Sequence, residues 1–364
     1  MKILFADLER EWRGGQSQAL LTLRGLQARG HEVELLGAKN SALVHRAKEA
    51  GITVHEVARG GLRGWAAIAI RKLMGTGGFA LVHANEPHAL TAAWMAGVQK
   101  GVPILLSRRI GFALQKNFIS RARYRAVEKF LANSKEVARS LVESGIASKR
   151  ILIVNEGVEI PAAVTGWQRV QARQRWKIAE EDFLFGCVSV LVPEKGQKHL
   201  LDALAIVRAS RPHARLILAG DGACRADLES QARRLKLENA VIFAGFVENV
   251  SQVYAALDAF VFPSEFEGLG TALQTAMAMG LPCLSTTRGG LAEVVEHERT
   301  ALVAEPSGEA FAQAMLRIMD EEILRRGIGE AAKLEVTNRF SADRMVENTI
   351  QAYQEVLLAR HTRE

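Results

Sequence analysis

The amino-acid sequence predicts an α/β protein with two domains, on three observations. Short apolar strands alternate with helical patterns along most of the chain, which is typical of parallel α/β units. The chain has 364 residues, enough for two domains at roughly 100–200 residues each. The alternation pauses after Ile160-Pro161, where residues 162–175 form a polar-to-basic connector. We therefore expect a domain boundary near residues 161–175.

The first half alternates strands and helices in a regular order. Helices are expected between the strands, for example over Gln16–Arg29, Pro87–Lys100 and Ser134–Glu143. Gly30 stands where a helix C-cap belongs, and Ser134 where an N-cap belongs. The expected strands are Lys2–Ala6, Glu32–Leu36, Thr53–Val57, Ala80–Ala84, Pro103–Ser107, Phe130–Ala132 and Ile151–Val154.

The second half restarts the alternation and ends in a long amphipathic helix over Ala342–Arg360. The pattern predicts two Rossmann-like domains facing each other across a cleft, with ligands beyond the carboxyl ends of the strands. We assign residues 1–165 to the first domain and 166–341 to the second, with 342–364 packing back toward the first. The expected strands are Phe183–Val190, Arg215–Ala219, Val241–Ala244, Ala259–Phe262, Cys283–Ser285 and Ala301–Val303.

Composition excludes several classes of protein. The chain is 48% hydrophobic, so it is not disordered as a whole. No uncharged apolar run approaches the roughly 18 residues of a membrane-spanning helix, and Met1–Ala6 is too short for a signal-peptide core. Cys187, Cys224 and Cys283 lie far apart without metal-ligand spacing. A reduced, cytoplasmic compartment is the expectation.

The net charge of +7 is unevenly distributed. Residues 1–166 contain 24 Lys and Arg against 13 Asp and Glu, whereas the rest contains 23 against 27, which predicts an anionic partner for the first half. Arg121, Arg125 and Lys129 recur every four residues and form one stripe if their segment is helical. The stripe is either a solvated face or a contact with an anionic membrane surface or a phosphorylated lipid acceptor. Only 6% of residues are aromatic and no nucleic-acid-binding fold is recognised, so nucleic acid is not expected as a partner.

Two short motifs stand where such domains bind ligands. Gly14-Gly15 opens a helix whose N-terminus favours anions, although a plain tight turn explains the pair equally well. The dinucleotide fingerprint G-x-G-x-x-G is absent. Lys195 follows a strand end, where a lysine suits a ligand phosphate, but a lone loop lysine is more often simply solvated.

A third motif follows the strand Ala259–Phe262. Gly268 and Gly270 free the backbone N–H groups at the start of the helix Ala272–Met279 to face an anion. Glu267 beside them either accepts hydrogen bonds from sugar hydroxyls or complements the helix dipole.

The ordered set of motifs resembles glycosyltransferase family 4 of the GT-B fold. The core of the resemblance is P-S-x-x-E-G-x-G from Pro263, then a helix, A-M-A-x-G-x-P, and Thr286–Gly290 with Glu293. So many ordered matches are far less expected by chance than any one, and together they favour functional roles for Lys195 and Glu267. The other matches are Gly14-Gly15, Gly30–Val33, Val82–Ala84, Ala132–Ser134, Pro193–Gly196, Ala219–Gly222 and Phe243–Val247.

The resemblance implies a retaining transfer of a sugar from a nucleotide-sugar donor, expected to be a UDP-sugar, with no metal or other cofactor. The second domain would bind the nucleotide sugar, and the first a saccharide or glycolipid acceptor of the cell envelope. By position, Lys195 would bind the donor diphosphate, Glu267 the donor sugar and the Val247 backbone the base. The backbone groups implied at the diphosphate belong to Gly15, Leu269, Gly270 and Thr271, and Gly14 and Thr275 are also expected among the donor-binding residues.

Three positions depart from the family pattern. Thr275 replaces a glutamate that usually holds the ribose. Val190 replaces an arginine on the diphosphate, a contact whose loss costs about 1.5–3 kcal/mol. Arg108-Arg109 stands where many members carry a histidine, and resembles a subgroup often assigned to lipopolysaccharide and other envelope polysaccharides. Arg109 is expected to supply the missing cation or to bind a phosphorylated acceptor.

Two other functions compete with this one. Thr275 and Val190 motivate a degenerate GT-B protein that binds a sugar nucleotide or glycan without turnover. A sugar-nucleotide epimerase of the same fold is opposed by Glu267–Gly270 and by the Gly14-Gly15 pair. Under the transferase interpretation, the chain is expected in the cytoplasm, peripheral to the inner face of the cell membrane.

Overall fold

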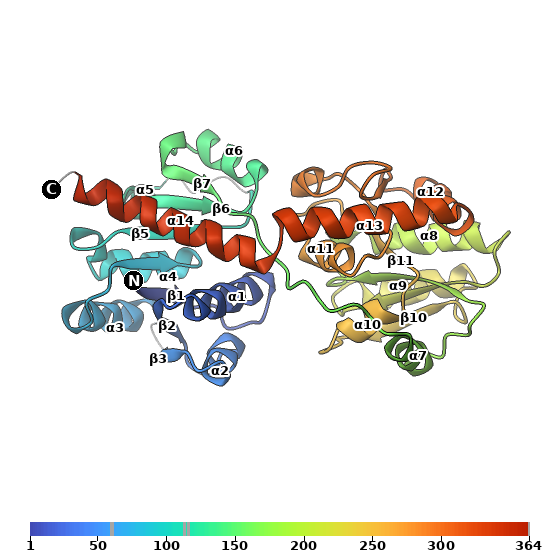
Figure 1. Cartoon of the computed structure of the whole chain (residues 1–364), viewed down its shortest axis with the longest axis horizontal. Coiled ribbons are helices and arrows are strands. Elements are labelled where there is room, and N and C mark those ends of the chain that lie inside the picture. The colour runs from blue at the N-terminus through green and yellow to red at the C-terminus, as the bar shows by residue number, and fades with distance from the viewer. Residues whose placement is uncertain (59–61, 112–113, 115–116, 363–364) are drawn as a thin grey trace. The chain divides into compact units, whose positions relative to one another are not determined.

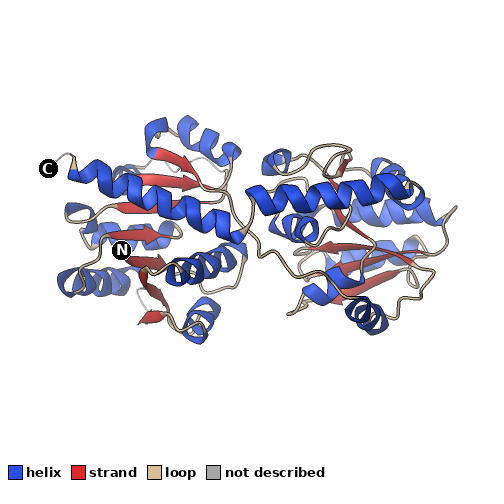
Figure 2. Ribbon diagram, viewed as in Figure 1, coloured by secondary structure: helices blue, strands red, loops and turns tan. Residues whose placement is uncertain are grey.

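The computed structural model describes all residues except 59–61, 112–113, 115–116 and 363–364. The chain forms two compact units, each with an open parallel sheet between layers of helices (Figures 1 and 2). Unit 1 comprises Met1–Gly157 and Ala342–Glu364, and unit 2 comprises Val158–Ser341. The predicted pair of parallel α/β domains is confirmed.

Unit 1 contains a seven-stranded sheet in the order β3-β2-β1-β4-β5-β6-β7. The order changes direction between β1 and β4, which creates a switch point where doubly wound sheets bind ligands. The strands are β1 (Lys2–Asp7), β2 (Glu32–Ala38), β3 (Thr53–Val57), β4 (Leu81–Ala84), β5 (Ile104–Arg108), β6 (Val127–Ala132) and β7 (Ile151–Ile153). The helices are α1 (Gly14–Ala28), α2 (Ala42–Glu49), α3 (Leu62–Thr76), α4 (Pro87–Met95), α5 (Phe118–Arg125), α6 (Lys135–Glu143) and α14 (Ala342–His361), with short 3-10 turns η1 (Val98–Lys100) and η2 (Ser148–Arg150).

The C-terminal helix α14 is part of unit 1, although it follows unit 2 in the chain. One core of unit 1 lies under α3, α4 and α6, and a second core lies under α1, α2 and α14. Tyr353 is fully buried in the second core. A Cβ at Gly25 of α1 would lie 2.4 Å from Val346 Cγ2, so a glycine is what allows α1 and α14 to pack this closely.

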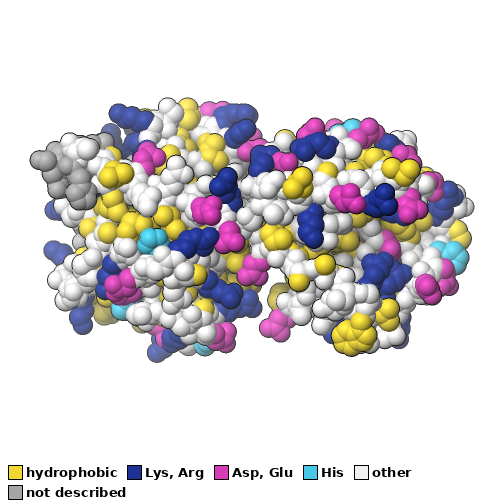
Figure 3. Space-filling model, viewed as in Figure 1, with side chains coloured by type: hydrophobic (Ala, Val, Ile, Leu, Met, Phe, Trp, Pro, Cys, Tyr) yellow, Lys and Arg dark blue, Asp and Glu magenta, His cyan; other side chains and the backbone are white. Residues whose placement is uncertain are grey.

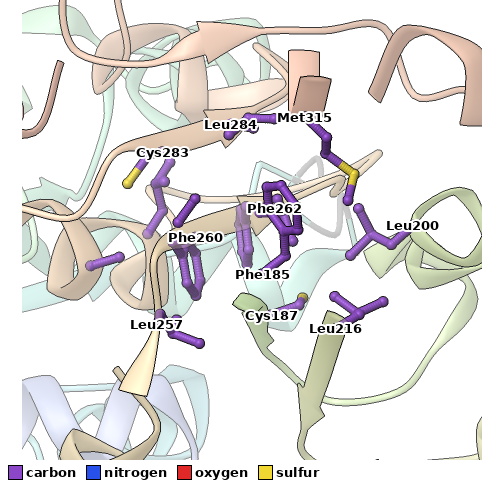
Figure 4. Close-up of a cluster of buried hydrophobic side chains, with 14 of the residues drawn as sticks. Phe185, Cys187, Leu200, Leu216, Leu257, Phe260, Phe262, Cys283, Leu284 and Met315 are labelled. Atoms are coloured by element: carbon purple, nitrogen blue, oxygen red, sulfur yellow. The ribbon is translucent and has the colours of Figure 1, made fainter. Parts of the chain in front are cut away.

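Unit 2 contains a six-stranded sheet in the order β10-β9-β8-β11-β12-β13, with its switch point between β8 and β11. Figure 4 shows part of its core, where Phe185 of β8 lies near Phe260 and Phe262 of β11. The strands are β8 (Phe183–Val188), β9 (Ala214–Ala219), β10 (Val241–Gly245), β11 (Ala259–Phe262), β12 (Cys283–Ser285) and β13 (Leu302–Val303). The helices are α7 (Gly166–Arg175), α8 (Gln197–Arg208), α9 (Arg225–Arg234), α10 (Ser251–Ala256), α11 (Thr271–Ala278), α12 (Gly308–Asp320) and α13 (Glu322–Arg339), with 3-10 turns η3 (Pro193–Lys195) and η4 (Gly289–Glu293).

The boundary between the units lies between Gly157 and Val158, earlier than the predicted 165/166. The predicted connector contains helix α7, which belongs to unit 2. Arg169 and Arg173 of α7 form ion pairs with Asp258 at 2.7 and 3.0 Å. These pairs fasten α7 to unit 2 and explain why the segment does not behave as a free linker.

The prediction that Arg121, Arg125 and Lys129 form one helical stripe is wrong. Arg121 and Arg125 are exposed on α5, but the chain then enters β6, where Lys129 pairs in register with Leu105 of β5. Lys129 Nζ forms an ion pair with Glu355 of α14 at 2.6 Å. On the face drawn in Figure 3, basic and acidic side chains are interspersed over unit 1, so its excess of basic residues forms no continuous patch there.

Candidate functional site

The switch point of unit 2 brings together two loops that carry predicted site residues. The loop after β8 contains η3 with Lys195, and the loop after β11 contains Glu267. Glu265 N donates to Glu194 O at 2.8 Å and so ties the two loops to each other. The strand order therefore places both motifs at one point of the sheet edge.

The position after Lys195 requires a glycine. Gly196 has φ +66°, and a Cβ there would lie 2.3 Å from Pro263 O. Any side chain would strain the backbone and push the two loops apart. The glycine therefore keeps Lys195 close to the loop that follows β11.

Lys195 and Glu267 form an ion pair between these loops. The Lys195 ammonium contacts the Glu267 carboxylate, and the side chains are 18% and 17% exposed. Glu267 Oε1 also accepts from Gly268 N at 3.1 Å. Partial burial strengthens such a pair because less water screens it. The pair offers one cation for an anionic ligand and one carboxylate for hydroxyl groups.

Helix α11 begins at Thr271, shortly after this pair. Its N-cap Gly270 has φ +66° and no side-chain cap, and the first turn contains no acidic residue. The first N–H groups of a helix lack partners within it, so this end is suited to an anion. A Cβ at Gly290 would lie 1.7 Å from Gly268 O, so η4 packs tightly against the loop and supports it. The structure thus groups Leu269, Gly270 and Thr271 with Glu267.

Thr275 lies one turn further along α11. Its hydroxyl donates to Thr271 O at 2.8 Å, which leaves it only as an acceptor for a ligand. The neighbouring Gln274 is fully buried, and its amide has no hydrogen-bond partner in the described part of the chain. Because it has no exposed surface, Gln274 does not replace the carboxylate that Thr275 lacks.

Val247 follows β10 at the same edge of the sheet. Gly220 N donates to Gly245 O at 2.8 Å, and Leu191 N donates to Asp221 O at 3.0 Å. These bonds interlock the loops after β8, β9 and β10. Val247 packs partly buried against the core of unit 2, and its backbone lies in this interlocked edge.

The other predicted site residues, Gly14, Gly15 and Arg109, lie at the carboxyl edge of the unit 1 sheet. Helix α1 begins at Gly14, and a Cβ at Gly15 would lie 3.9 Å from Arg109 Cδ. Arg109 Nε lies 3.0 Å from Glu156 Oε1, and Nη1 donates to Asn85 O at 3.0 Å. An anionic ligand would compete with Glu156 for this guanidinium.

Asp7 and Asn85 support the same edge, and the sequence analysis missed both. Asp7 is buried at the end of β1, where it accepts from Gln16 Nε2 at 3.1 Å and from Asn85 Nδ2 at 2.6 Å. Asn85 Nδ2 also donates to Gly15 O at 3.4 Å. Burial raises the pKa of Asp7, and the hydrogen bonds from Asn85 and Gln16 oppose that rise. The network fixes the turn at Gly14-Gly15. Its signal in the sequence was that Asp7 and Asn85 are polar residues at the ends of buried strands.

Glu86 caps helix α4 close to Asp7. Its carboxylate accepts from Ala89 N at 2.7 Å and from Leu8 N at 3.2 Å. Burial, followed by the charge of Asp7, raises the pKa of Glu86 to about 7. Glu9, Glu86 and His88 offer metal-ligand atoms within 4.8 Å of one another, but the Glu86 oxygens already accept backbone N–H groups. The group is therefore explained as a helix cap.

Two family models match successive parts of the chain. The model described as Glycosyltransferase Family 4 matches residues 12–160, and the model described as Glycosyl transferases group 1 matches residues 168–335. The two matches together cover most of both units.

Relatives of known name align with parts of the chain. N-acetyl-alpha-D-glucosaminyl L-malate synthase of Bacillus anthracis is 29% identical over 188 residues, which is 51% of this chain and 49% of that protein. A GDP-mannose-dependent monoacylated alpha-(1-6)-phosphatidylinositol monomannoside mannosyltransferase of Corynebacterium glutamicum is 33% identical over 183 residues, 47% of each protein. The chain thus aligns with about half the length of these curated relatives.

Solved structures resemble the chain over both units. HepE of Anabaena, in complex with UDP and glucose, superposes with a TM-score of 0.85 and 22% identity over 97% of this chain and 99% of that one. WaaG, a glycosyltransferase involved in lipopolysaccharide biosynthesis, superposes with a TM-score of 0.71 and 18% identity over 97% and 99%. At these identities the likeness establishes a shared fold.

Proposed function

The chain belongs to glycosyltransferase family 4 and has the GT-B fold, and from this premise we propose a specific reaction. It transfers a sugar, with retention of configuration, from a nucleotide-sugar donor to a saccharide or glycolipid acceptor of the cell envelope. The observation that carries the proposal is the Lys195–Glu267 pair at the unit 2 switch point, next to the start of α11. The proposal includes no metal and no other cofactor.

The proposed chemistry places growing negative charge next to Lys195. As the acceptor oxygen bonds to the anomeric carbon, the bond from that carbon to the diphosphate breaks, and its electron pair goes to the diphosphate oxygen. That oxygen takes the proton of the acceptor hydroxyl. Lys195 and the N–H groups at the start of α11 are fixed before the reaction, so they stabilise the leaving group without reorganising.

The ion pair also provides a way to admit the donor. Without a ligand, Glu267 neutralises the Lys195 ammonium. A diphosphate carries more negative charge than one carboxylate, so it replaces Glu267 as the partner of Lys195. The released carboxylate then accepts hydrogen bonds from the hydroxyls of the donor sugar. Binding exchanges one counterion for another, which avoids an unpaired charge in a partly buried site.

We propose a UDP-sugar as donor, with its base at the Val247 backbone. Support comes from HepE, which has been solved with UDP and with UDP-glucose. Gly14, Gly15 and Arg109 are proposed as anion-binding groups of unit 1, because they lie together at its sheet edge. The competing function, binding without turnover, is favoured by Thr275, whose hydroxyl is already bonded to its own helix.

The direct test is whether the purified chain releases free nucleotide from UDP-glucose and related nucleotide sugars. Release supports turnover, whereas binding without release supports the competing function. The variant Arg109→Ala, measured in the same assay, tests whether the proposed anion-binding group of unit 1 takes part in the reaction. Release and transfer that are unchanged in Arg109→Ala would remove Arg109 from the catalytic groups.

We also propose that unit 1 contacts an anionic membrane surface on the cytoplasmic side, through α5 rather than through the predicted stripe. Phe118 and Ile119 in the first turn of α5 are 86% and 61% exposed, and Arg121 and Arg125 on the same helix are exposed as well. In the described part of the chain, no helix combines the length and the apolar character needed to cross a bilayer. Exposed apolar and basic side chains on one helix are typical of interfacial contact.

Replacing Arg121 and Arg125 together by alanine should weaken binding to phosphatidylglycerol-containing vesicles roughly 30-fold, since each basic residue near the surface contributes about 1 kcal/mol. Co-sedimentation measures the effect. Arg139→Ala, an exposed arginine on α6, is the control and should bind as the wild type does. Equal binding to neutral phosphatidylcholine vesicles, or a double variant that still binds fully, would contradict the proposal.

A further inference from the structure

Unit 1 contains a pocket of about 630 Å³. It is lined by residues of the segment 8–13 after β1, by Leu62–Gly64 at the start of α3, and by His88 at the start of α4. The pocket therefore lies at the β1/β4 switch point, where doubly wound sheets bind ligands. Its volume is in the range of small-molecule sites. Lys195 and Glu267 are in the other unit and do not line it.

The charges of the lining favour a ligand with one anionic group. Arg10, Arg13 and Arg63 line the pocket together with Glu9 and Glu11. Arg13 is paired with Glu11, whereas Arg63 has no ion pair with any residue that the structure describes. A single anion next to Arg63 is therefore matched, while a polyanion filling the pocket would meet two carboxylates.

The position of Arg63 strengthens this preference. It lies in the first turn of α3, a 15-residue helix with no acidic residue in that turn. The N-terminal end of a helix adds a partial positive charge of its own. The pKa of His88 is lowered, first by burial and then by the charge of Arg63, while the charge of Glu9 opposes the shift.

The rest of the lining suits a hydroxyl-rich ring. Carboxylates of Glu9 and Glu11 accept hydrogen bonds from hydroxyls, and guanidinium groups donate to ring and hydroxyl oxygens. Leu62, which is partly exposed, offers apolar contact for the C–H face of such a ring. Alternating acceptors, donors and apolar surface recognise a sugar better than they recognise an aliphatic acid.

We infer that this pocket binds a saccharide that carries a phosphate group, with the phosphate at Arg63 and the sugar hydroxyls at Glu9 and Glu11. The inference rests on the proposed function for the role of this ligand, which is that of the acceptor. It adds Arg63 to the anion-binding groups proposed for unit 1, where Arg109 is paired with Glu156 in the absence of a ligand.

The test compares N-acetylglucosamine 6-phosphate with N-acetylglucosamine, by ligand-observed NMR and calorimetry on the full chain. The phosphorylated sugar should bind at least about tenfold more tightly, and Arg63→Ala should remove most of that difference. Arg71→Ala, an exposed arginine on the same helix outside the pocket, should have no effect. Lys195→Ala should also leave this binding unchanged, because Lys195 lies in unit 2.

Equal binding of the two sugars, or a loss in Arg71→Ala as large as in Arg63→Ala, would overturn the inference. A loss that occurs only in Lys195→Ala would show that the phosphate binds in unit 2, and would overturn it too. Phosphatidylinositol diluted in phosphatidylcholine vesicles forms a second arm. Binding that falls in Arg63→Ala in both arms supports a lipid headgroup as the source of the phosphate, and a fall in the sugar-phosphate arm alone supports a free phosphorylated sugar. UDP-glucose is titrated into the same samples. If it binds while neither phosphate probe does, this inference fails and the proposed donor site stands.

Discussion

Replacing Lys195 with alanine should weaken the binding of UDP-glucose roughly 100-fold and lower turnover by about 10²- to 10³-fold, the usual effect of losing one group that stabilises a leaving anion. The variant loses the cation and also leaves the Glu267 carboxylate without its partner. The unpaired carboxylate then repels the diphosphate, which in the wild type replaces Glu267 as the partner of Lys195. Calorimetric titration and initial rates measure the two effects.

Lys198→Ala is the matched control for this substitution. Lys198 lies on α8, three positions after Lys195, and its ion pair with Glu265 spans 3.5 Å at a side chain that is 57% exposed. The substitution Lys198→Ala removes the same charge from the same region. It should change the binding of UDP-glucose by less than about twofold, because exposed ion pairs contribute little to stability. If both variants bind UDP-glucose as the wild type does, Lys195 is not a donor contact.

Replacing Tyr353 with alanine should destabilise unit 1 by about 4 kcal/mol, because the substitution leaves a cavity in the core under α14. Tyr353 is fully buried, and its hydroxyl lies 2.5 Å from His83 Nδ1. His83 Nε2 lies 2.7 Å from Ser107 Oγ, so the variant also breaks a buried hydrogen-bond chain. Burial lowers the pKa of His83 to about 3, so the ring is neutral in the folded chain.

Chemical unfolding monitored with separate probes for the two units measures this effect. Unit 1 should unfold at a lower denaturant concentration in Tyr353→Ala, while the midpoint of unit 2 stays unchanged. Leu358→Ala on the same helix is the control, because Leu358 is 67% exposed and should change stability by less than about 0.5 kcal/mol. A unit 1 midpoint that does not move in Tyr353→Ala, or that moves as far in Leu358→Ala, would contradict the prediction.

The sequence was sufficient to predict the elements that are determined locally. Gly30 follows α1 with φ +77°, as a C-cap requires, and Ser134 Oγ accepts from Val137 N at 3.1 Å as an N-cap. Each of these features depends on a few neighbouring residues. The parallel sheets followed from the alternation of apolar strands with helices, which repeats throughout both units.

Helix α7 was missed because it has no buried apolar stripe. Trp167 and Val170 are 71% and 52% exposed, so the hydrophobic periodicity that marks a packed helix is absent. The sequence contained one signal for the start of this helix, namely Thr165 followed three residues later by Gln168, which form a capping box. The bonds that fasten the helix to unit 2 join residues distant in sequence, and the linear pattern does not reveal them.

The candidate site was predictable as two motifs, but their pairing was not. Lys195 and Glu267 were identified from motif order, whereas their ion pair depends on the strand order that places β8 beside β11. Asp7 and Asn85 were missed for the same reason, since they are distant in sequence and meet only at the switch point of unit 1. Residues at strand ends acquire their partners from topology, which local sequence does not encode.

The proposed function requires that unit 2 turns over a nucleotide sugar at Lys195 and Glu267. Nucleotide release from a panel of UDP-, GDP-, ADP- and TDP-sugars measures this turnover, with the anomeric configuration of the released sugar followed by NMR. We expect the wild type to release nucleotide slowly without an acceptor, with UDP-glucose among the active donors and α-glucose as the first product, and we expect Glu267→Gln to lose most of this activity. No release from any donor in the panel, or β-glucose as the first product, would contradict the proposed retaining transferase.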